Sequence, residues 1–172
     1  FGIININMDL NETFLKVIED HRGILYKIVR SYCKSEEDRK DLIQEIIFQL
    51  WKSFKKYDNH YKYSTWIYRI ALNISISFYR KNRTLQTSSL PLEENIFTFQ
   101  EIEIDKEKEY QINQLQVFID ELKEIDKAIM LLYLEEKNHK EISEIIGISE
   151  TNVGTKINRI KKILLVKFQN SK

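Results

Sequence analysis

The fold is decided by residues 41–83, which read DLIQEIIFQLWKSFKKYDNHYKYSTWIYRIALNISISFYRKNR. In the first part of this stretch, apolar residues recur at the spacing of one face of an α-helix. They are Leu42, Ile43, Ile46, Ile47, Leu50 and Trp51. The opposite face carries the polar residues Asp41, Gln44 and Glu45, with the ring of Phe48 among them. An isolated exposed ring is common on protein surfaces, but we interpret this helix as packing one face on a core and docking the other on a partner.

A loop rich in tyrosine and a second predicted helix follow. Ser64 is the expected N-cap of that helix, because serine hydroxyls accept hydrogen bonds from the first backbone N–H groups. Its buried side is expected to consist of Trp66, Ile67, Ile70, Ala71, Ile74 and Phe78. Its polar side is expected to carry Arg69, Asn73, Arg80, Lys81 and Arg83.

Basic and aromatic residues are interleaved over residues 52–83. Eight basic residues stand against one acid, Asp58, for a local charge of +7. Five tyrosines and one tryptophan lie among them, and they are Tyr57, Tyr61, Tyr63, Trp66, Tyr68 and Tyr79. Cations that follow phosphates and rings that stack on unpaired bases are typical of single-stranded nucleic acid binding. Judged on this stretch alone, a solvated basic face over an aromatic core is an equally good interpretation.

The composition predicts an all-α protein that binds no cofactor. The 172 residues include only four glycines and one proline, and no alternating strand pattern is present. Cys33 is the single cysteine and the three histidines are scattered, so we expect no disulfide, no metal site and a reducing cytoplasm. Residues 1–7 are apolar but too short to span a membrane, and without a charged stretch or a small-residue cleavage site we expect them not to be a targeting signal.

Three or four helices are predicted before Thr84. The first runs from a cap at Asn11 to Ser35. Its apolar positions are Phe14, Val17, Ile18, His21, Leu25, Ile28, Val29 and Tyr32. Ser35 followed by Asp38 is expected to cap the next helix, which is the docking helix, and Cys33 is expected to be a small core residue.

Two domains are predicted, at residues 1–83 and 110–172, with an acidic linker at 84–109. The linker contains the only proline and seven acids against two lysines, and it lacks the apolar residues needed to fold alone. From residue 110 the helical spacing returns, and we expect two helices with a break at residues 124–126.

Residues 139–164 read HKEISEIIGISETNVGTKINRIKKIL and predict a helix-turn-helix. Ile142, Ser143 and Ile146 form the inner face of a short helix, and Gly147 provides a left-handed turn. Ile148 is expected to fill the core and Ser149 to cap the second helix. Val153, Ile157 and Ile160 of that helix are expected to point inward. An ordinary helical hairpin is the alternative.

DNA binding is favoured over that alternative by the residues that follow. Residues 137–172 contain eight basic residues and three acids. Lys156, Arg159, Lys161 and Lys162 are among the basic residues, and Thr151, Asn152 and Thr155 lie near the start of the second helix, where side chains reach base edges in a major groove. This basic module also favours nucleic acid binding for residues 52–83.

Taken together, the two stretches resemble the bacterial RNA polymerase sigma factors of the extracytoplasmic-function (ECF) group. DLIQEIIFQLW resembles the polymerase-docking helix of that family, and TWIYRIALNISISFYRKNR resembles its minus-ten recognition and melting helix. KEISEIIGISETNVGTKINRIKKIL resembles its minus-thirty-five helix-turn-helix. The resemblance runs from about residue 14 to residue 168, in the family's order.

The resemblance implies an initiation factor that is not an enzyme and that acts on promoter DNA with core RNA polymerase. The first domain would dock on the β′ clamp helices, the second would hold the β flap, and the linker would run through the polymerase towards its active-site cleft and RNA exit channel. The docking residues would be Asp41, Gln44, Glu45 and Phe48. The minus-ten residues would be Asn59, Tyr61, Lys62, Trp66, Arg69, Asn73, Arg80, Lys81 and Arg83. The minus-thirty-five residues would be Ser149, Thr151, Asn152, Thr155, Lys156, Arg159 and Lys161.

Further partners and departures from the family pattern follow from the same resemblance. An anti-sigma factor would restrain the chain, or a DNA-bound protein, such as an RNA-guided, nuclease-dead Cas-type protein, would recruit it.

Leu72 and Ser77 stand where arginine and aspartate are common, and Gly154 stands where the family usually has lysine or arginine. We therefore expect the second domain alone to bind its duplex weakly.

Two other classes are weighed beside the sigma factors. A response-regulator-like or quorum-type transcription factor would share the helix-turn-helix, but it would bring a receiver or ligand domain. An enzyme acting on nucleic acid would need a carboxylate cluster, a nucleophile with its base, or a phosphate-binding glycine loop, and the sequence shows none of these.

Overall fold

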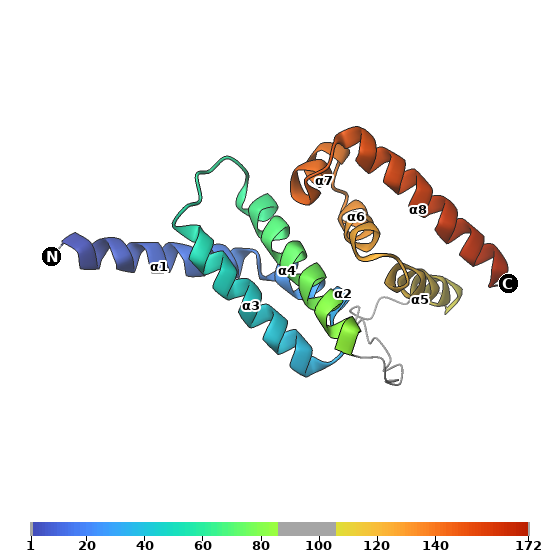
Figure 1. The fold of residues 1–172 in the computed structure, drawn as a ribbon, viewed down its shortest axis with the longest axis horizontal. Coiled ribbons are helices and arrows are strands. Elements are labelled where there is room, and N and C mark those ends of the chain that lie inside the picture. The colour runs from blue at the N-terminus through green and yellow to red at the C-terminus, as the bar shows by residue number, and fades with distance from the viewer. Residues whose placement is uncertain (1, 86–105, 172) are drawn as a thin grey trace. The chain divides into compact units, whose positions relative to one another are not determined.

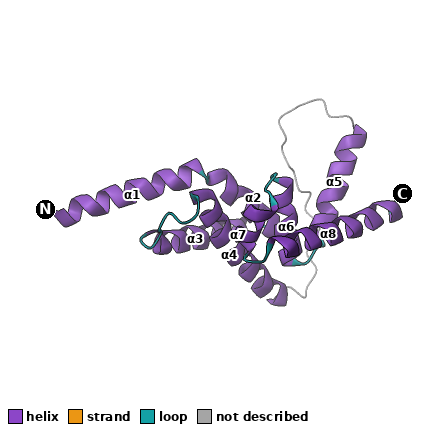
Figure 2. Cartoon of the chain, turned by 90° about the horizontal axis from the view of Figure 1, so that it is seen from above, coloured by secondary structure: helices purple, strands orange, loops and turns teal. Residues whose placement is uncertain are grey.

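The computed structural model describes the backbone of residues 2–85 and 106–171, and the side chains of residues 10–82 and 108–171. Within these residues the chain forms eight helices, α1 to α8, and every regular element is a helix (Figures 1 and 2). The predicted all-α fold is thus confirmed. The chain divides into two compact units, Phe1–Pro91 and Leu92–Lys172. Residues 86–105 of the predicted linker at 84–109 lie outside the described residues, whereas its two ends belong to helices, and its bounds stay a prediction.

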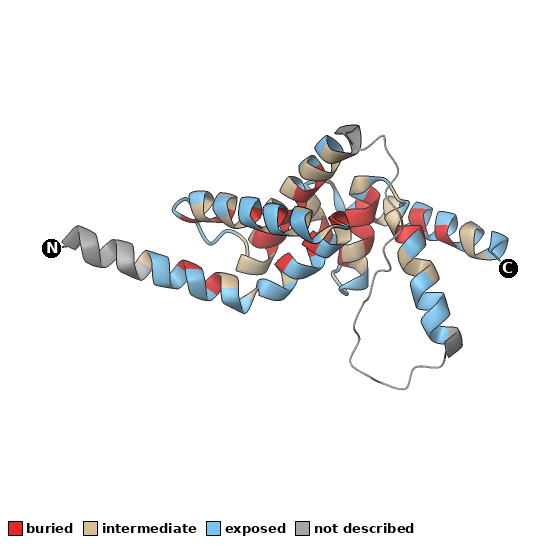
Figure 3. Cartoon of the chain, turned by 90° about the horizontal axis from the view of Figure 1, so that it is seen from below, coloured by how far each residue is buried: buried red, intermediate tan, exposed pale blue. Residues whose placement is uncertain are grey.

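The first unit consists of α1 (Gly2–Asp20), α2 (Arg22–Tyr32), α3 (Glu36–Phe54) and α4 (Tyr63–Leu85). The helix α4 packs against both α2 and α3, and Figure 1 shows α3 and α4 side by side. Fully buried residues from three helices meet in this core, among them Leu25, Leu42, Ile46, Leu50 and Ile67 (Figure 3). Burial of each such side chain stabilises the fold by roughly 1.5–3 kcal/mol.

The prediction of one helix from Asn11 to Ser35 is wrong, because the chain turns at His21. Its backbone leaves the helical region, at φ −117° and ψ 13°, and its ring Nδ1 lies 2.8 Å from the Val17 carbonyl oxygen. The turn lets the two parts pack on different neighbours. Phe14 of α1 contacts Trp51 and Phe54 of α3, at centroid distances of 5.0 and 5.2 Å, whereas α2 packs mainly on α4. The first helix also begins at Gly2, before the expected cap.

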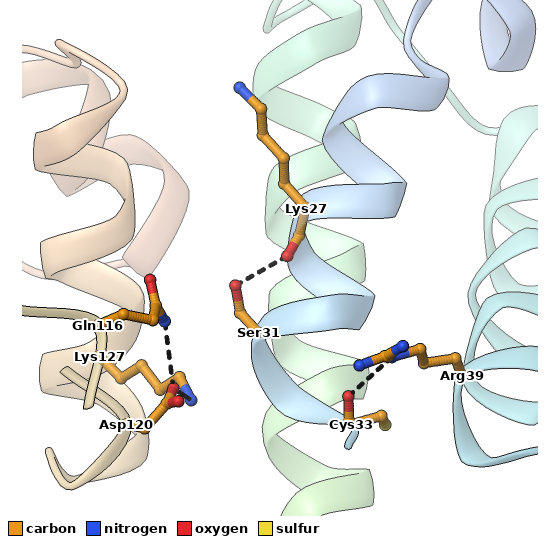
Figure 4. A network of polar contacts seen from close by, with 7 residues as sticks. All are labelled: Lys27, Ser31, Cys33, Arg39, Gln116, Asp120 and Lys127. Carbon is orange, nitrogen blue, oxygen red and sulfur yellow. Dashed lines mark hydrogen bonds and ion pairs between the residues drawn. The ribbon is translucent and has the colours of Figure 1, made fainter. Parts of the chain in front are cut away.

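The start of α3 is as predicted. The Ser35 hydroxyl accepts a hydrogen bond from the Asp38 backbone N–H at 3.1 Å. The side chain of Arg39 donates to the Cys33 carbonyl oxygen at 3.0 Å, which ties the end of α2 to the first turns of α3 (Figure 4). Cys33 is buried, as expected.

Two predictions for α4 are wrong. The helix begins at Tyr63, and the Lys62 carbonyl oxygen accepts from the Trp66 N–H at 3.1 Å, so Ser64 lies inside the first turn and does not cap it. The buried face is also rotated, because α4 has to contact α2 as well as α3. Its buried residues are Thr65, Ile67, Tyr68, Ala71, Leu72, Ser75 and Ile76. Trp66, Ile70, Ile74 and Phe78 are only partly buried.

The second unit consists of α5 (Lys106–Asp120), α6 (Glu124–Leu134), α7 (His139–Ile146) and α8 (Glu150–Asn170). The long helix α8 contacts α5, α6 and α7. Its buried residues are Val153, Ile157, Ile160 and Leu164. The chain breaks between α5 and α6 at residues 121–123, so the break predicted at 124–126 is placed three residues too late.

The helix-turn-helix between α7 and α8 forms as the sequence predicts. Gly147 adopts the left-handed conformation at φ 81°, and the Ser149 hydroxyl accepts from the Asn152 N–H at 3.2 Å. A capping box that we did not predict starts α7, where Asn138 and Glu141 each bind the backbone N–H of the other, at 2.9 and 3.0 Å. The inner face of α7 is formed by Ile142 and Ile145, whereas Ile146 and Ser143 are half-buried. Ser143 and Ile146 were therefore both assigned wrongly.

Candidate polymerase and nucleic-acid interfaces

The outer face of α3 carries the four candidate docking residues together. Asp41, Gln44, Glu45 and Phe48 are all exposed, and Phe48 exposes 57% of its surface. The core residues of the same helix, such as Ile46, are fully buried. The Gln49 side-chain amide donates to the Glu45 carboxylate at 2.9 Å. The face therefore presents a ring surrounded by acceptor groups, and the helix behind it is anchored in the core.

A groove that the sequence did not predict lies between α3 and α4. Its volume is about 530 Å³. It is lined by Glu45, Gln49 and Ser53 of α3 and by Ile70, Asn73, Ile74, Ser77, Phe78 and Lys81 of α4. Its apolar floor is formed by Ile70, Ile74 and Phe78, which the sequence had led us to assign to the core. The groove brings a docking candidate, Glu45, beside two minus-ten candidates, Asn73 and Lys81.

The loop between α3 and α4 is held by its own side chains and by an aromatic cluster. The Tyr57 hydroxyl donates a hydrogen bond to the Tyr61 carbonyl oxygen, and the Asp58 carboxylate accepts from the His60 N–H at 3.0 Å. Asn59 has a positive φ of 59°, which asparagine tolerates better than most residues. Burial raises the pKa of Tyr57, and the charges of Tyr63 and Asp58 add to this effect.

Rings at the two ends of this loop stack on one another. Tyr57 stacks on Tyr63 at a centroid distance of 4.6 Å, with 24° between the ring planes, and contacts Trp66 at 5.3 Å. The guanidinium of Arg69 lies 5.1 Å from the centre of the Tyr61 ring, and His60 meets the same ring edge-on at 4.5 Å. The loop candidates Asn59 and Tyr61 are thus brought to the end of α4 that carries Trp66 and Arg69.

The other minus-ten candidates lie further away. Lys62 is exposed at the start of α4, and Asn73, Arg80 and Lys81 are exposed along it. Arg83 belongs to the same helix, but its side chain lies outside the described residues. Tyr68 is buried, with only 6% of its surface exposed, so the interpretation of this ring as one that stacks on bases is wrong.

The exposed face of α8 carries short polar side chains. Ser149, Thr151, Asn152 and Thr155 are exposed, and the Thr155 hydroxyl donates to the Thr151 carbonyl oxygen at 3.0 Å. Thr151, Thr155 and Lys162 lie on one face, opposite the buried residues, because α-helical residues repeat about every 3.6 positions. Lys162 and the exposed Asn158, one turn before it, were left out of the predicted minus-thirty-five residues. Their helical spacing from Thr151 and Thr155 is the signal that places them on the same face.

The three cations assigned to this site each bind another part of the second unit. Lys156 Nζ lies 3.2 Å from one carboxylate oxygen of Asp126, and Arg159 Nη2 lies 2.6 Å from the other. Lys161 Nζ binds the Tyr133 hydroxyl at 2.7 Å and lies 4.3 Å from the centre of that ring. Both Asp126 and Tyr133 belong to α6.

An ion pair between the buried Lys127 and Asp120 ties α6 to α5. Lys127 Nζ lies 2.6 Å from Asp120 Oδ1, and the Gln116 amide donates to the same oxygen at 3.4 Å (Figure 4). Lys127 is buried, with 6% of its surface exposed. A buried lysine needs such a partner, since an unpaired buried charge is strongly destabilising.

Neither a metal site nor a membrane-spanning helix is found in the part of the chain that the structure describes. Nowhere there do three histidine, cysteine or acidic side chains gather as a metal would require. The described helices also lack a segment long and apolar enough to cross a membrane.

Comparison with known proteins gives two family matches in chain order. Residues 17–84 match the model of Sigma-70 region 2, and residues 112–164 match that of Sigma-70, region 4. The chain is 28% identical over 152 residues to the RNA polymerase sigma factor SigV of Bacillus subtilis (strain 168), covering 88% of each chain. It is 28% identical over 161 residues to the ECF RNA polymerase sigma factor SigM of the same organism, covering 91% of this chain and 93% of SigM.

Solved structures of low sequence identity share the fold. The sigma factor RpoE, in complex with the anti-sigma factor NepR from Bartonella quintana, superimposes with a TM-score of 0.68 at 16% identity, covering 95% of this chain and 99% of RpoE. CnrH, in complex with the cytosolic domain of CnrY, gives a TM-score of 0.67 at 17% identity, covering 94% of this chain and 91% of CnrH.

Proposed function

Since the chain belongs to the ECF group of the sigma-70 family, we propose which of its surfaces meet RNA polymerase and which meet the promoter. As a sigma factor it binds core RNA polymerase and promoter DNA in transcription initiation, and it is not itself an enzyme. The observation that carries the proposal is the order of its two modules, each with an exposed polar face over a closed core.

The outer face of α3 docks on the clamp helices of the polymerase β′ subunit. Support comes from Phe48, a large exposed ring on an otherwise polar face, beside the carboxylate of Glu45. Aromatic anchors surrounded by polar groups are typical of the residues that contribute most to protein interfaces. Asp41 and Gln44 extend the same contact.

A photo-crosslinking experiment tests this assignment. A photoreactive phenylalanine analogue at Phe48 should crosslink to the β′ subunit when the chain is mixed with core polymerase. Tyr26 on α2 is a matched control, because 62% of its surface is exposed, against 57% for Phe48. Equal crosslinking from both positions, or none from Phe48 in a complex that does form, would contradict the docking assignment.

Minus-ten recognition and melting are assigned to the loop after α3 and to the exposed side of α4. The loop offers Asn59, Tyr61 and Lys62, and α4 offers Trp66, Arg69, Asn73, Arg80, Lys81 and Arg83. The support is the nearness of Tyr61 and Arg69 at the start of a helix whose exposed residues include further cations. Rings and cations in one place suit a flipped base and its phosphates.

Minus-thirty-five recognition is assigned to α8. Thr151, Asn152 and Thr155 are exposed near its start, and Ser149 forms the cap there. The cations Lys156, Arg159 and Lys161 stay candidates, but each binds a residue of α6 in the structure. These contacts support the expectation that the second unit alone binds duplex DNA weakly.

The remaining proposals concern organisation and partners. We assign residues 1–83 and 110–172 to the two domains, with the acidic segment 84–109 running through the polymerase and the second domain on the β flap. RpoE and CnrH were each solved with a partner, NepR and CnrY, and NepR is an anti-sigma factor. We therefore propose an anti-sigma factor for this chain, with recruitment by a DNA-bound protein, including the RNA-guided Cas-type, as the alternative. The chain would act in the cytoplasm, where it meets polymerase and DNA.

A further inference from the structure

A buried carboxylate on α6 holds two cations of the DNA-recognition helix. Asp126 exposes only 6% of its surface. Each of its carboxylate oxygens takes one partner, Lys156 Nζ at 3.2 Å and Arg159 Nη2 at 2.6 Å. The three residues are separated by 30 and 33 positions in the sequence, so the arrangement is a product of the fold.

The position of these cations on α8 sets them apart from Lys162. The buried face of α8 is formed by Val153, Ile157, Ile160 and Leu164. At about 3.6 residues per turn, Lys162 lies opposite this face, together with Thr151 and Thr155. Lys156 and Arg159 lie on the flank that meets α6, where the Lys156 side chain is 25% exposed and the Arg159 side chain is 56% exposed.

Releasing these cations to DNA would be unfavourable. For Lys156, a phosphate would have to replace the carboxylate that already accepts its charge-assisted hydrogen bond, and Arg159 would lose its bond from Nη2 to Asp126 if its guanidinium turned towards a phosphate. The carboxylate of Asp126 would then be left buried without its partners, which is strongly destabilising.

We propose that Asp126 withholds Lys156 and Arg159 from the phosphate backbone and so limits the affinity of α8 for DNA. The inference rests on the proposed role of α8 in binding duplex DNA. It assigns to Asp126 a positioning role that weakens binding to all sequences equally, because phosphates carry no sequence information. Base discrimination is left to Thr151, Asn152 and Thr155.

The test is a salt titration of the affinity of the full chain for a labelled duplex, followed by fluorescence anisotropy. Three variants each remove one cation from the same helix, namely Lys156→Gln, Arg159→Gln and Lys162→Gln. Each lost phosphate contact lowers the slope of log K against log salt by about 0.9. Lys162→Gln should show this loss, whereas Lys156→Gln and Arg159→Gln should leave the slope unchanged.

A fourth variant, Asp126→Asn, removes the charge and keeps the shape. It should tighten binding to any duplex, on the order of fivefold to tenfold at 0.1 M salt for each released cation, and steepen the slope by one to two units. Circular dichroism confirms the fold of each variant, and the lysine and arginine variants still decide the question if Asp126→Asn unfolds.

The outcomes separate the inference from the proposal on which it rests. If Lys156→Gln and Arg159→Gln lower the slope as much as Lys162→Gln does, α8 binds DNA but Asp126 withholds nothing, and the inference is overturned. If none of the three variants changes the slope and Asp126→Asn binds like wild type, the assignment of α8 to duplex DNA is itself overturned.

Discussion

Tyr57 joins the aromatic cluster of the first unit to the loop assigned to minus-ten recognition. Its ring stacks on Tyr63, and its hydroxyl donates to the carbonyl oxygen of Tyr61. Replacing Tyr57 by phenylalanine keeps the ring and removes this hydrogen bond. We expect the free energy of unfolding of the first unit to fall by about 0.5–1.5 kcal/mol. Urea unfolding followed by tryptophan fluorescence measures this, since both tryptophans, Trp51 and Trp66, lie in the first unit.

The difference in the free energy of unfolding between wild type and Tyr57→Phe should change with pH in a defined direction. The folded chain raises the pKa of Tyr57 above its usual 10.0, chiefly through burial, so the unfolded chain loses this proton first. The contribution of Tyr57 to the free energy of unfolding is therefore fully present below pH 10, and it declines as the pH rises towards the pKa that Tyr57 has in the folded chain. The stability difference between wild type and Tyr57→Phe should be constant from pH 7 to 9 and shrink above it. A difference that grows above pH 10 would contradict this account.

Two glycines of the helix-turn-helix should respond in opposite ways to alanine. A Cβ atom at Gly154 would lie 3.4 Å from Cε1 of His139, an ordinary contact, and alanine favours the helix by about 0.8–1.0 kcal/mol over glycine. Gly154→Ala should therefore slow hydrogen exchange of the α8 amides. Gly147 has φ 81°, where an L-residue costs about 1–2 kcal/mol, so Gly147→Ala should speed exchange in α7 and α8. Faster exchange in Gly154→Ala would show that His139 cannot accommodate the methyl group.

At the scale of single elements, α4 is the helix that the melting assignment depends on. Tyr61→Ala and Asn73→Ala remove a loop ring and an exposed amide without touching the buried face. Because stacking on one base contributes roughly 1–3 kcal/mol, promoter opening should fall by about fivefold or more while closed-complex binding changes little. Permanganate reactivity of the minus-ten thymines measures the opening.

The control for this experiment is an exposed cation elsewhere in the same unit. Arg22→Ala on α2 removes a side chain that is 75% exposed and pairs with Glu19. It should leave permanganate reactivity at the wild-type level. Wild-type reactivity in Tyr61→Ala and Asn73→Ala as well would mean that promoter opening does not use this end of α4.

The sequence predicted elements well where the deciding contacts are local. The cap of α3 at Ser35 and the turn at Gly147 depend on neighbours within three or four residues, and both formed as expected. The buried face of α4 was misassigned because apolar residues occur around most of this helix, and only contact with α2 selects among them. The break at His21 was missed because the apolar spacing continues through it.

Long-range pairing explains what sequence patterns left out of the candidate sites. Lys156 and Arg159 look like DNA contacts when α8 is read alone, yet their partner Asp126 lies on another helix. The groove between α3 and α4 was likewise hidden, since Ile70, Ile74 and Phe78 have the spacing of a core face. The four docking candidates were correctly placed on one exposed face, because helical spacing alone determines which side of α3 they share.

At the scale of the whole molecule, charge is distributed by function and not evenly. The net charge is only +1, but residues 52–83 carry +7 and residues 137–172 carry +5. Each basic segment belongs to a different compact unit. Each unit thus carries a basic segment, although Lys156 and Arg159 of the second segment are paired with Asp126, and positive charge raises the rate at which a phosphate backbone is met. This arrangement suits a factor that contacts a promoter at two places.

The central claim, that the chain directs core RNA polymerase to promoters, is tested most directly by run-off transcription from a library of genomic fragments. Core polymerase should produce discrete transcripts only when the chain is added, and their start sites should share sequence elements at fixed upstream positions. Core polymerase alone, and core polymerase with the Phe48→Ala variant, serve as controls. If the folded chain binds core polymerase and yields no start sites beyond those of core polymerase alone, the claim is contradicted.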